Sequence, residues 1–219
     1  MSVSKTILNR HSVRDFESTP VSVNLISDIL NTAKYSPSNC NHQPWNVYIL
    51  TDKIKEDLSQ AIIDSFERSS CSSSYPYLPK KWIYPFSKRR KDIGSTLYNT
   101  IGIEYEDKEK INDHYKRNFK FYGAPIGLIF TINNTLEYGS FLDYGMFLQN
   151  ILLLSEEKGL STCTIGFFTE YPDPIQQTLN LNKSDRIVCG MAVGYKKQDS
   201  IINTVRSERE PLSSFVHIL

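Results

Sequence analysis

The sequence predicts a domain that mixes helices and strands, of the α/β or α+β class. The length of 219 residues suits one domain with a sizeable core. Short runs of β-forming residues lie between longer segments with helical apolar periodicity, and the two kinds of segment alternate irregularly. No internal repeat and no Gly/Ser-rich or Pro-rich linker divides the chain. We therefore expect a single domain over residues 1–219.

The first half of the chain carries two predicted helices around one predicted strand. Pro20 precedes a helix with one apolar stripe, formed by Leu25, Ile26, Ile29, Leu30 and Ala33. Residues 47–50 (VYIL) predict a strand. Asp52 is expected to cap a second helix, whose inner face is Ile54, Leu58, Ala61, Ile62 and Phe66. Residues 69–88 are rich in Ser, Pro and aromatics, too apolar for a free linker, and predict a packed loop.

The second half alternates charged and strongly apolar segments. Residues 89–121 are highly charged and predict one broken helix or two. The apolar runs 125–132 and 187–195 predict buried strands. Residues 141–158 predict an apolar helix closed by Gly159, the usual residue for a left-handed cap. The polar tail from Lys196 ends in apolar residues, which suggests an arm wrapped over another surface.

Charge and composition exclude several classes of function. A formal net charge of +1 gives no field that would gather nucleic acid or a membrane surface. No apolar run approaches the roughly 20 residues of a membrane span, and the N-terminus lacks an apolar signal region, so we expect a cytoplasmic protein. The four cysteines are scattered, without metal-ligand spacing, and no P-loop or GxGxxG motif occurs. The basic run 88–91 is interpreted as a solvated helix start, and His114 and His217 as isolated surface residues.

A first candidate site lies in residues 9–16 (NRHSVRDF). In an extended chain, Arg10, Ser12 and Arg14 point to one face. Two guanidinium groups and a hydroxyl suit a phosphate, because arginine supplies charge and paired donors. By itself this spacing of Arg and Ser is common, and it favours the alternative of a solvated basic turn over a phosphate site.

A second candidate site is the run 36–45 (SPSNCNHQPW), which connects a predicted helix to a predicted strand. Turns of Pro, Ser and Asn present backbone N–H groups and short polar side chains at close range. The alternative is an ordinary connection with Trp45 in the core. The clustering of Ser38, Asn39 and Asn41 favours a ligand site.

These two motifs together resemble the nitroreductase superfamily of FMN enzymes. The resemblance extends over almost the whole chain, and the motifs occur in the family's order. They are RHSVR (10–14), PSxxNxQPW (37–45), YGAP (122–125), DYGMFLQ (143–149), GLSTC (159–163), CGMAVGY (189–195) and RSEREPL (206–212). With WIYP (82–85) and the charged insert, the chain is most similar to the nitrobenzoate-reductase-like branch.

The resemblance implies an α+β fold in which a mostly antiparallel mixed sheet is flanked by helices and a C-terminal arm extends over a partner subunit. It also implies a homodimer with FMN between the subunits. One subunit would surround the phosphate and ribityl chain with Arg10, His11, Ser12 and Arg14, and the partner would contribute Pro37, Ser38, Asn39 and Asn41. Thr164, Ile165 and Gly166 would border the isoalloxazine, and Arg209, with Arg206 as a second candidate, would close on the phosphate.

The activity implied by the resemblance is transfer of hydride from NADH or NADPH, through the flavin, to a nitroaromatic or quinone-like acceptor in a ping-pong cycle. No side chain is nominated as an acid or base. Three positions depart from the family pattern: Asn39, Thr164 and Gly166. The alternatives are a reductive dehalogenase or heterocycle oxidase on the same scaffold, and a protein that stores or senses FMN without turnover.

Overall fold

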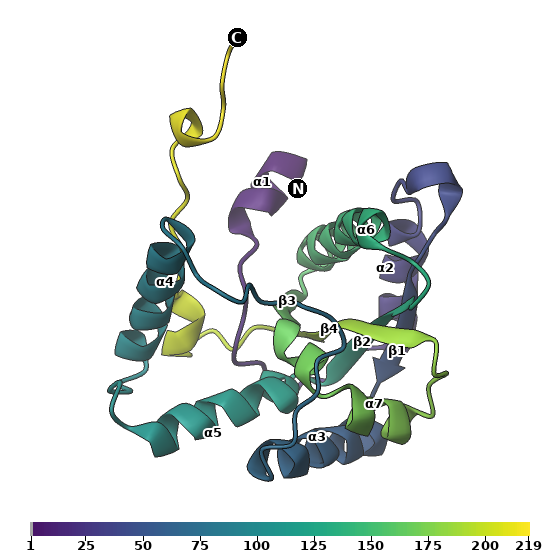
Figure 1. Cartoon of the computed structure of the whole chain (residues 1–219), viewed down its shortest axis with the longest axis horizontal. Coiled ribbons are helices and arrows are strands. Elements are labelled where there is room, and N and C mark those ends of the chain that lie inside the picture. The colour runs from purple at the N-terminus through teal and green to yellow at the C-terminus, as the bar shows by residue number, and fades with distance from the viewer. Residues whose placement is uncertain (1) are drawn as a thin grey trace.

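The computed structural model describes residues 2–219 and shows an antiparallel sheet with helices on both faces (Figure 1). The four strands follow the order β1-β2-β4-β3, and every neighbouring pair is antiparallel. Their bounds are Asn46–Leu50 (β1), Ile126–Asn133 (β2), Ser161–Ile165 (β3) and Asp185–Gly194 (β4). The helices of the described chain are Val3–Asn9 (α1), Val23–Ala33 (α2), Asp52–Glu67 (α3), Phe86–Thr100 (α4), Lys108–Phe119 (α5), Tyr138–Glu157 (α6) and Pro172–Leu179 (α7).

The sheet separates two hydrophobic cores, and the fold is α+β as predicted. On one face α3, α7 and the end of α5 bury side chains such as Leu58, Phe119 and Ile175. On the other face α2 and α6 bury Ile29 and Phe147 among others. Because both faces are covered, β2 and β4 are apolar on both sides and appear in the sequence as continuous apolar runs.

The helix α6 is the central helix of the second core. The Tyr144 hydroxyl donates to the carbonyl oxygens of Asn46 in β1 (2.9 Å) and Thr131 in β2 (3.0 Å). Trp45 stacks on Phe147 with ring centroids 4.6 Å apart. Beyond its C-terminus Gly159 has a φ of +77°, the left-handed conformation that the sequence predicts there. This helix therefore ties the first strand to the middle of the sheet.

The charged region forms two helices, α4 and α5, separated by a turn in which Gly102 has a φ of +65°. No residue of α4 is buried, whereas α5 buries His114, Asn118 and Phe119. The prediction of a surface position for His114 is therefore wrong. The helical period places it on the inner face of α5, four residues before Asn118.

The start of α3 differs in detail from the sequence prediction, and two elements were not anticipated. Thr51 is the N-cap of α3 and Asp52 is its first residue, while Ile54 is 38% exposed instead of facing the core. The strand β3 and the helix α7 had no predicted counterpart. Neither α6 nor any other helix within residues 2–219 has the length and apolar character of a membrane span.

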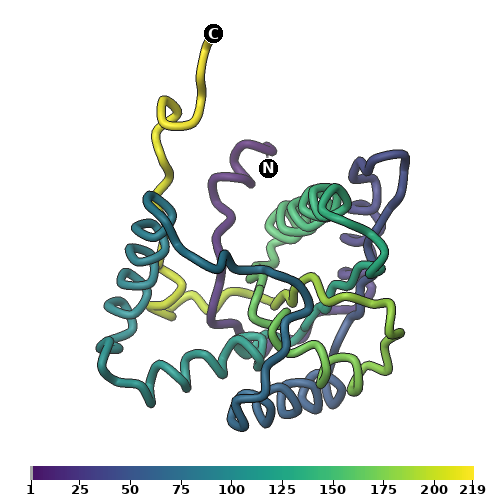
Figure 2. The backbone as a smooth tube through the Cα atoms, in the orientation of Figure 1, coloured from purple at the N-terminus to yellow at the C-terminus, as the bar shows by residue number. Residues whose placement is uncertain are grey.

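Both ends of the chain extend from the body. The C-terminal segment leaves it beside α4 and points away (Figures 1 and 2). Its apolar side chains are exposed, Phe215 by 62% and Ile218 by 96%. On α1, Leu8 is 83% exposed. Large apolar side chains exposed in this way are suited to contact with another surface, which favours the predicted arm.

Candidate functional site

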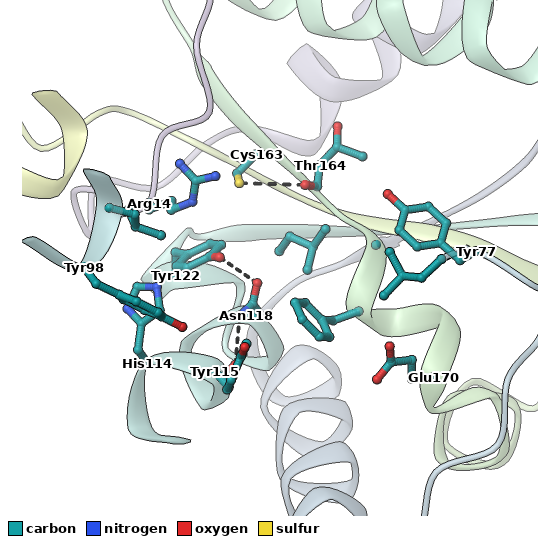
Figure 3. Close-up of a pocket in the computed structure, with 15 residues that line it drawn as sticks. Arg14, Tyr77, Tyr98, His114, Tyr115, Asn118, Tyr122, Cys163, Thr164 and Glu170 are labelled. Carbon is teal, nitrogen blue, oxygen red and sulfur yellow. Dashed lines mark hydrogen bonds between the residues drawn. The ribbon is translucent and has the colours of Figure 1, made fainter. Parts of the chain in front are cut away.

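A pocket of about 280 Å³ opens beside the end of β3 (Figure 3). Its walls come from the segment before α2, the loop after α3, the inner faces of α4 and α5, and the exit of β3. The lining residues are Arg14, Tyr77, Leu78, Leu97, Tyr98, His114, Tyr115, Asn118, Tyr122, Cys163, Thr164, Ile165, Gly166, Phe167 and Glu170.

The segment that carries Arg10, Ser12 and Arg14 runs extended alongside β3. Ser12 forms a parallel bridge with Thr162, and the N–H of Val13 donates to the Thr162 carbonyl oxygen at 3.0 Å. All three polar side chains act on the buried thiol of Cys163. Burial raises the pKa of Cys163, while the charge of Arg14, the hydroxyl of Ser12 and the charge of Arg10 act in the opposite direction. The structure thus gathers the predicted cationic group in one place.

His11 lies in the same segment and has a buried polar atom without a partner. Its Nδ1 is 3.0 Å from the Asn9 carbonyl oxygen, and its Nε2 is buried with no hydrogen-bond partner in the described residues. Burial lowers the pKa of His11, and the charge of Arg206 acts in the same direction. Because a carbonyl oxygen only accepts, the neutral ring donates from Nδ1, and its Nε2 is left as an acceptor that suits a hydroxyl group of a ligand.

Asn203, in the C-terminal region, fixes this segment in place. Its Oδ1 accepts from the N–H of Arg14 at 2.8 Å. Its Nδ2 donates to the carbonyl oxygens of Asp15 (2.7 Å) and Lys197 (3.1 Å). Arg206 Nη1 donates to the Asn203 carbonyl oxygen at 2.9 Å, so Arg206 joins the same group.

Arg209 lies apart from this arrangement. Its Nη1 donates to the carbonyl oxygens of Ser207 (2.9 Å) and Glu208 (3.0 Å) and to the Ser207 hydroxyl (2.6 Å), on an exposed part of the chain. Of the two late arginines, Arg206 bonds to Asn203 and its charge acts on His11, whereas the hydrogen bonds of Arg209 stay within residues 207–209.

The inner face of α5 forms one wall of the pocket and was not anticipated as a site. Arg117 Nη2 donates to the carbonyl oxygen of Arg14 at 2.8 Å. Burial, followed by the charges of Arg117 and Arg14, lowers the pKa of His114 to about 4. Tyr98 of α4 meets His114 edge-on, with centroids 5.8 Å apart, and the Tyr122 hydroxyl donates to Asn118 Oδ1 at 2.6 Å. This wall is aromatic, neutral and rigidly hydrogen-bonded.

The exit of β3 forms the floor of the pocket. Thr164, Ile165 and Gly166 all line it, and they lead into the 3-10 turn Gly166–Glu170. The side chain of Ile165 is buried, and burial raises the pKa of Glu170 at the far end of the turn. Gly166 carries no side chain, and the place that a Cβ atom would take there is filled by the ring of Tyr77.

The second candidate segment forms a tight turn against α6. Ser38 Oγ accepts from the N–H of Gln43 at 3.0 Å, and the N–H of Asn39 donates to Asp143 Oδ2 at 3.2 Å. Asn41 has a left-handed φ of +57°. Pro37, Ser38, Asn39 and Asn41 therefore stand together on a constrained turn.

The two candidate segments do not meet within one chain. The turn contacts α6 at Asp143, whereas His11 is influenced by the charge of Glu156 near the other end of that helix. At about 1.5 Å per residue, the thirteen helical steps from Asp143 to Glu156 span about 20 Å. In Figure 1 the helix α6 lies between α1 and the turn. One phosphate cannot contact both segments of the same chain.

Comparison with known proteins gives consistent matches. The profile of the Nitroreductase family matches residues 7–195. A 4-nitrobenzoate reductase of Pseudomonas putida is 36% identical over 213 residues, which cover 97% of this chain and 93% of that protein. A nitrobenzene nitroreductase of Ectopseudomonas oleovorans is 33% identical over 220 residues, with coverage of 98% and 97%. This chain also superposes on the crystal structure of the FMN and NADPH-dependent nitroreductase NfnB from Sphigopyxis sp. strain HMH with a TM-score of 0.97. The two are 26% identical, and the match covers 100% of this chain and 99% of that one.

Proposed function

The chain belongs to the nitroreductase family, and we propose that it is an FMN-dependent oxidoreductase that passes hydride from NADH or NADPH to a nitroaromatic or quinone-like acceptor. The observation that carries this proposal is that Arg14 lines a pocket whose floor is the exit of β3, with Arg10 and Ser12 on the same extended segment. A cationic segment at one side and a floor formed by residues 164–166 at the other suit the two parts of a flavin nucleotide.

The residues present fit FMN. A phosphate group carries almost two negative charges. When it is removed from water it requires about two cations and additional neutral donors. Arg10, Arg14 and Arg206 supply the cations, Ser12 supplies a hydroxyl, and His11 Nε2 is an acceptor for a hydroxyl of the ribityl chain. These residues would hold the phosphate and ribityl chain, while the backbone of 164–166 would border the ring.

FMN, when bound, supplies the hydride-accepting and hydride-donating chemistry. The protein orients the reactants and excludes water. Arg14 places a fixed positive charge beside the pocket floor, which favours negative charge that develops there. Because donor and acceptor share one pocket, they use it in turn, in a ping-pong order. We assign no side chain as an obligatory acid or base.

We also propose that the active enzyme is a homodimer in the cytoplasm. The two donor segments lie toward opposite ends of α6, which leaves each incomplete, and a partner chain would supply the Pro37–Asn41 turn. The exposed apolar C-terminal arm, with Phe215 and Ile218, would cover the partner. Arg209 would reach the phosphate only in that assembled state.

The test is the visible absorption spectrum of the purified protein, recorded anaerobically before and after addition of NADH and of NADPH. We expect flavin bands that bleach with at least one nucleotide. The variant Arg14→Ala is expected to lose most of the bound flavin. A colourless protein that does not take up added FMN would contradict the proposal. A yellow protein that neither nucleotide bleaches would favour a storage role.

A further inference from the structure

The loop after α3 is fastened to the turn that follows β3. The N–H of Ser72 donates to the Glu170 carbonyl oxygen at 3.0 Å, and the N–H of Ser74 donates to the Thr169 carbonyl oxygen at 2.8 Å. The Tyr75 hydroxyl donates to the Val188 carbonyl oxygen in β4 at 3.0 Å. Beyond this fastened part the loop is exposed, with Tyr84 at 77%. The predicted packed loop is therefore hydrogen-bonded to the body in its first half, although most of its residues are exposed.

The fastened part places the Tyr77 ring directly on Gly166. A Cβ atom at Gly166 would lie 2.4 Å from Cε1, 2.5 Å from Cζ and 2.6 Å from the hydroxyl oxygen of Tyr77. Contacts this short are impossible, so the ring can occupy this place only because residue 166 is a glycine. Tyr75 supports the ring from the side in an edge-on contact, with centroids 6.0 Å apart.

Tyr77 presents an amphipathic group to the pocket. Figure 3 shows Tyr77 and Glu170 at one end of the pocket, and Arg14, Tyr98 and His114 at the other. Tyr77 itself is half exposed, and its hydroxyl has no hydrogen-bond partner among the residues described. Burial raises the pKa of the phenol, so the hydroxyl is a neutral donor at neutral pH.

On the basis of the proposed function, we propose that Tyr77 is the acceptor-binding residue of the site. Its ring, seated on Gly166, forms the wall that limits the size of the acceptor. Its hydroxyl donates a hydrogen bond to an oxygen of the acceptor's nitro or quinone group. That oxygen gains negative charge during reduction, so the hydrogen bond strengthens in the transition state.

The experiment compares Tyr77→Phe and Tyr77→Ala in the FMN-loaded protein, with nitrobenzene, 1-nitronaphthalene and benzoquinone as acceptors. Tyr77→Phe removes only the hydroxyl, and we expect kcat/KM for all three acceptors to fall about tenfold, the effect of one neutral hydrogen bond. Tyr77→Ala also opens the wall, and we expect the ratio of kcat/KM for 1-nitronaphthalene over nitrobenzene to rise. The control Tyr105→Phe, on an 82% exposed tyrosine outside the pocket, is expected to change neither.

Two further measurements separate this inference from the proposed function. FMN affinity, from the quenching of flavin fluorescence, and bleaching by NAD(P)H without acceptor are expected to stay within about twofold of wild type in Tyr77→Phe, which keeps the ring on Gly166. If the wild-type protein bleaches but the Tyr77 variants keep the wild-type kcat/KM for all three acceptors, the role of Tyr77 alone is overturned. A wild-type protein that does not bind FMN or does not bleach would overturn both.

Gly166→Ala tests the seat of the ring. In the wild-type background its new methyl group must displace Tyr77, whose side-chain atoms are the three nearest neighbours. We expect it to shift the acceptor ratio as Tyr77→Ala does. In the Tyr77→Ala background the same substitution should add no further shift. An additive double variant would contradict the proposed contact.

Discussion

The substitution Asn203→Ala tests how the cationic segment is held. The Asn203 side chain is 4% exposed and makes three hydrogen bonds, to the Arg14 N–H and to the carbonyl oxygens of Asp15 and Lys197. Each such bond contributes about 1 kcal/mol, and a buried group left without a partner adds to the loss. We therefore expect the free energy of unfolding to fall by about 2–4 kcal/mol.

The same substitution should weaken FMN binding, because the backbone of Arg14 loses its anchor. Urea unfolding of the FMN-free protein, at one fixed protein concentration, measures the first effect, and a flavin fluorescence titration measures the second. Asn203→Asp keeps the acceptor for the Arg14 N–H but turns a carboxylate oxygen toward two carbonyl oxygens, so we expect at least an equal loss at neutral pH.

The matched control is Asn134→Ala, whose exposed side chain donates one long bond, 3.4 Å, to the Lys183 carbonyl oxygen. It should change the free energy of unfolding by less than about 0.5 kcal/mol. If Asn203→Ala stayed within that same limit and kept its FMN affinity, the anchoring role of Asn203 would be refuted.

Two further predictions concern stability. Because the pKa of His114 is lowered to about 4, the unfolded chain binds the proton more readily between that pH and about 6.5, so stability falls on acidification through this window. With allowance for solvent screening, the free energy of unfolding should fall by about 1–2 kcal/mol from pH 7 to pH 5 because of this residue. In urea titrations, His114→Gln should remove that part of the pH dependence, and His217→Gln should leave it unchanged. Gly190→Ala would place a methyl group 2.6 Å from the fully buried Phe168 ring and should lower the free energy of unfolding by about 1–3 kcal/mol. Gly94→Ala, in α4 with open space around it, should raise it by about 0.5–1 kcal/mol, and equal effects of the two on the urea midpoint would contradict the packing described.

The elements that the sequence predicts well are those with a strong apolar pattern. The strands β2 and β4 are covered on both faces, and α6 is apolar over most of its length. Each therefore appears in the sequence as a long apolar segment that can be recognised without knowledge of its neighbours. The strand β3 (STCTI) lies at the edge of the sheet and is rich in hydroxyl side chains, which gives no such pattern. The helix α7 begins Pro-Asp-Pro, which resembles a turn, although prolines are tolerated in a first helical turn.

The candidate site was predictable where the chain makes local motifs and not where distant segments meet. Arg10, Ser12 and Arg14 converge because they alternate along an extended segment. Asn203 reaches that segment from 189 positions away, and no local pattern indicates it. His114 has a local signal, its spacing from Asn118 on one face of α5, but the surrounding charges conceal it.

The central claim, a flavin site completed by two subunits, is tested most directly by complementation. One variant carries Arg10→Ala and Arg14→Ala. The other carries Asn39→Ala and Asn41→Gly, where glycine keeps the left-handed φ accessible. Each alone should lose FMN-dependent NAD(P)H oxidation. After the two are unfolded together and refolded, random pairing gives hybrids with one intact site, and we expect about a quarter of the wild-type activity to return. Activity no higher than the mean of the two variants, with hybrid dimers demonstrated by mass, would contradict the account.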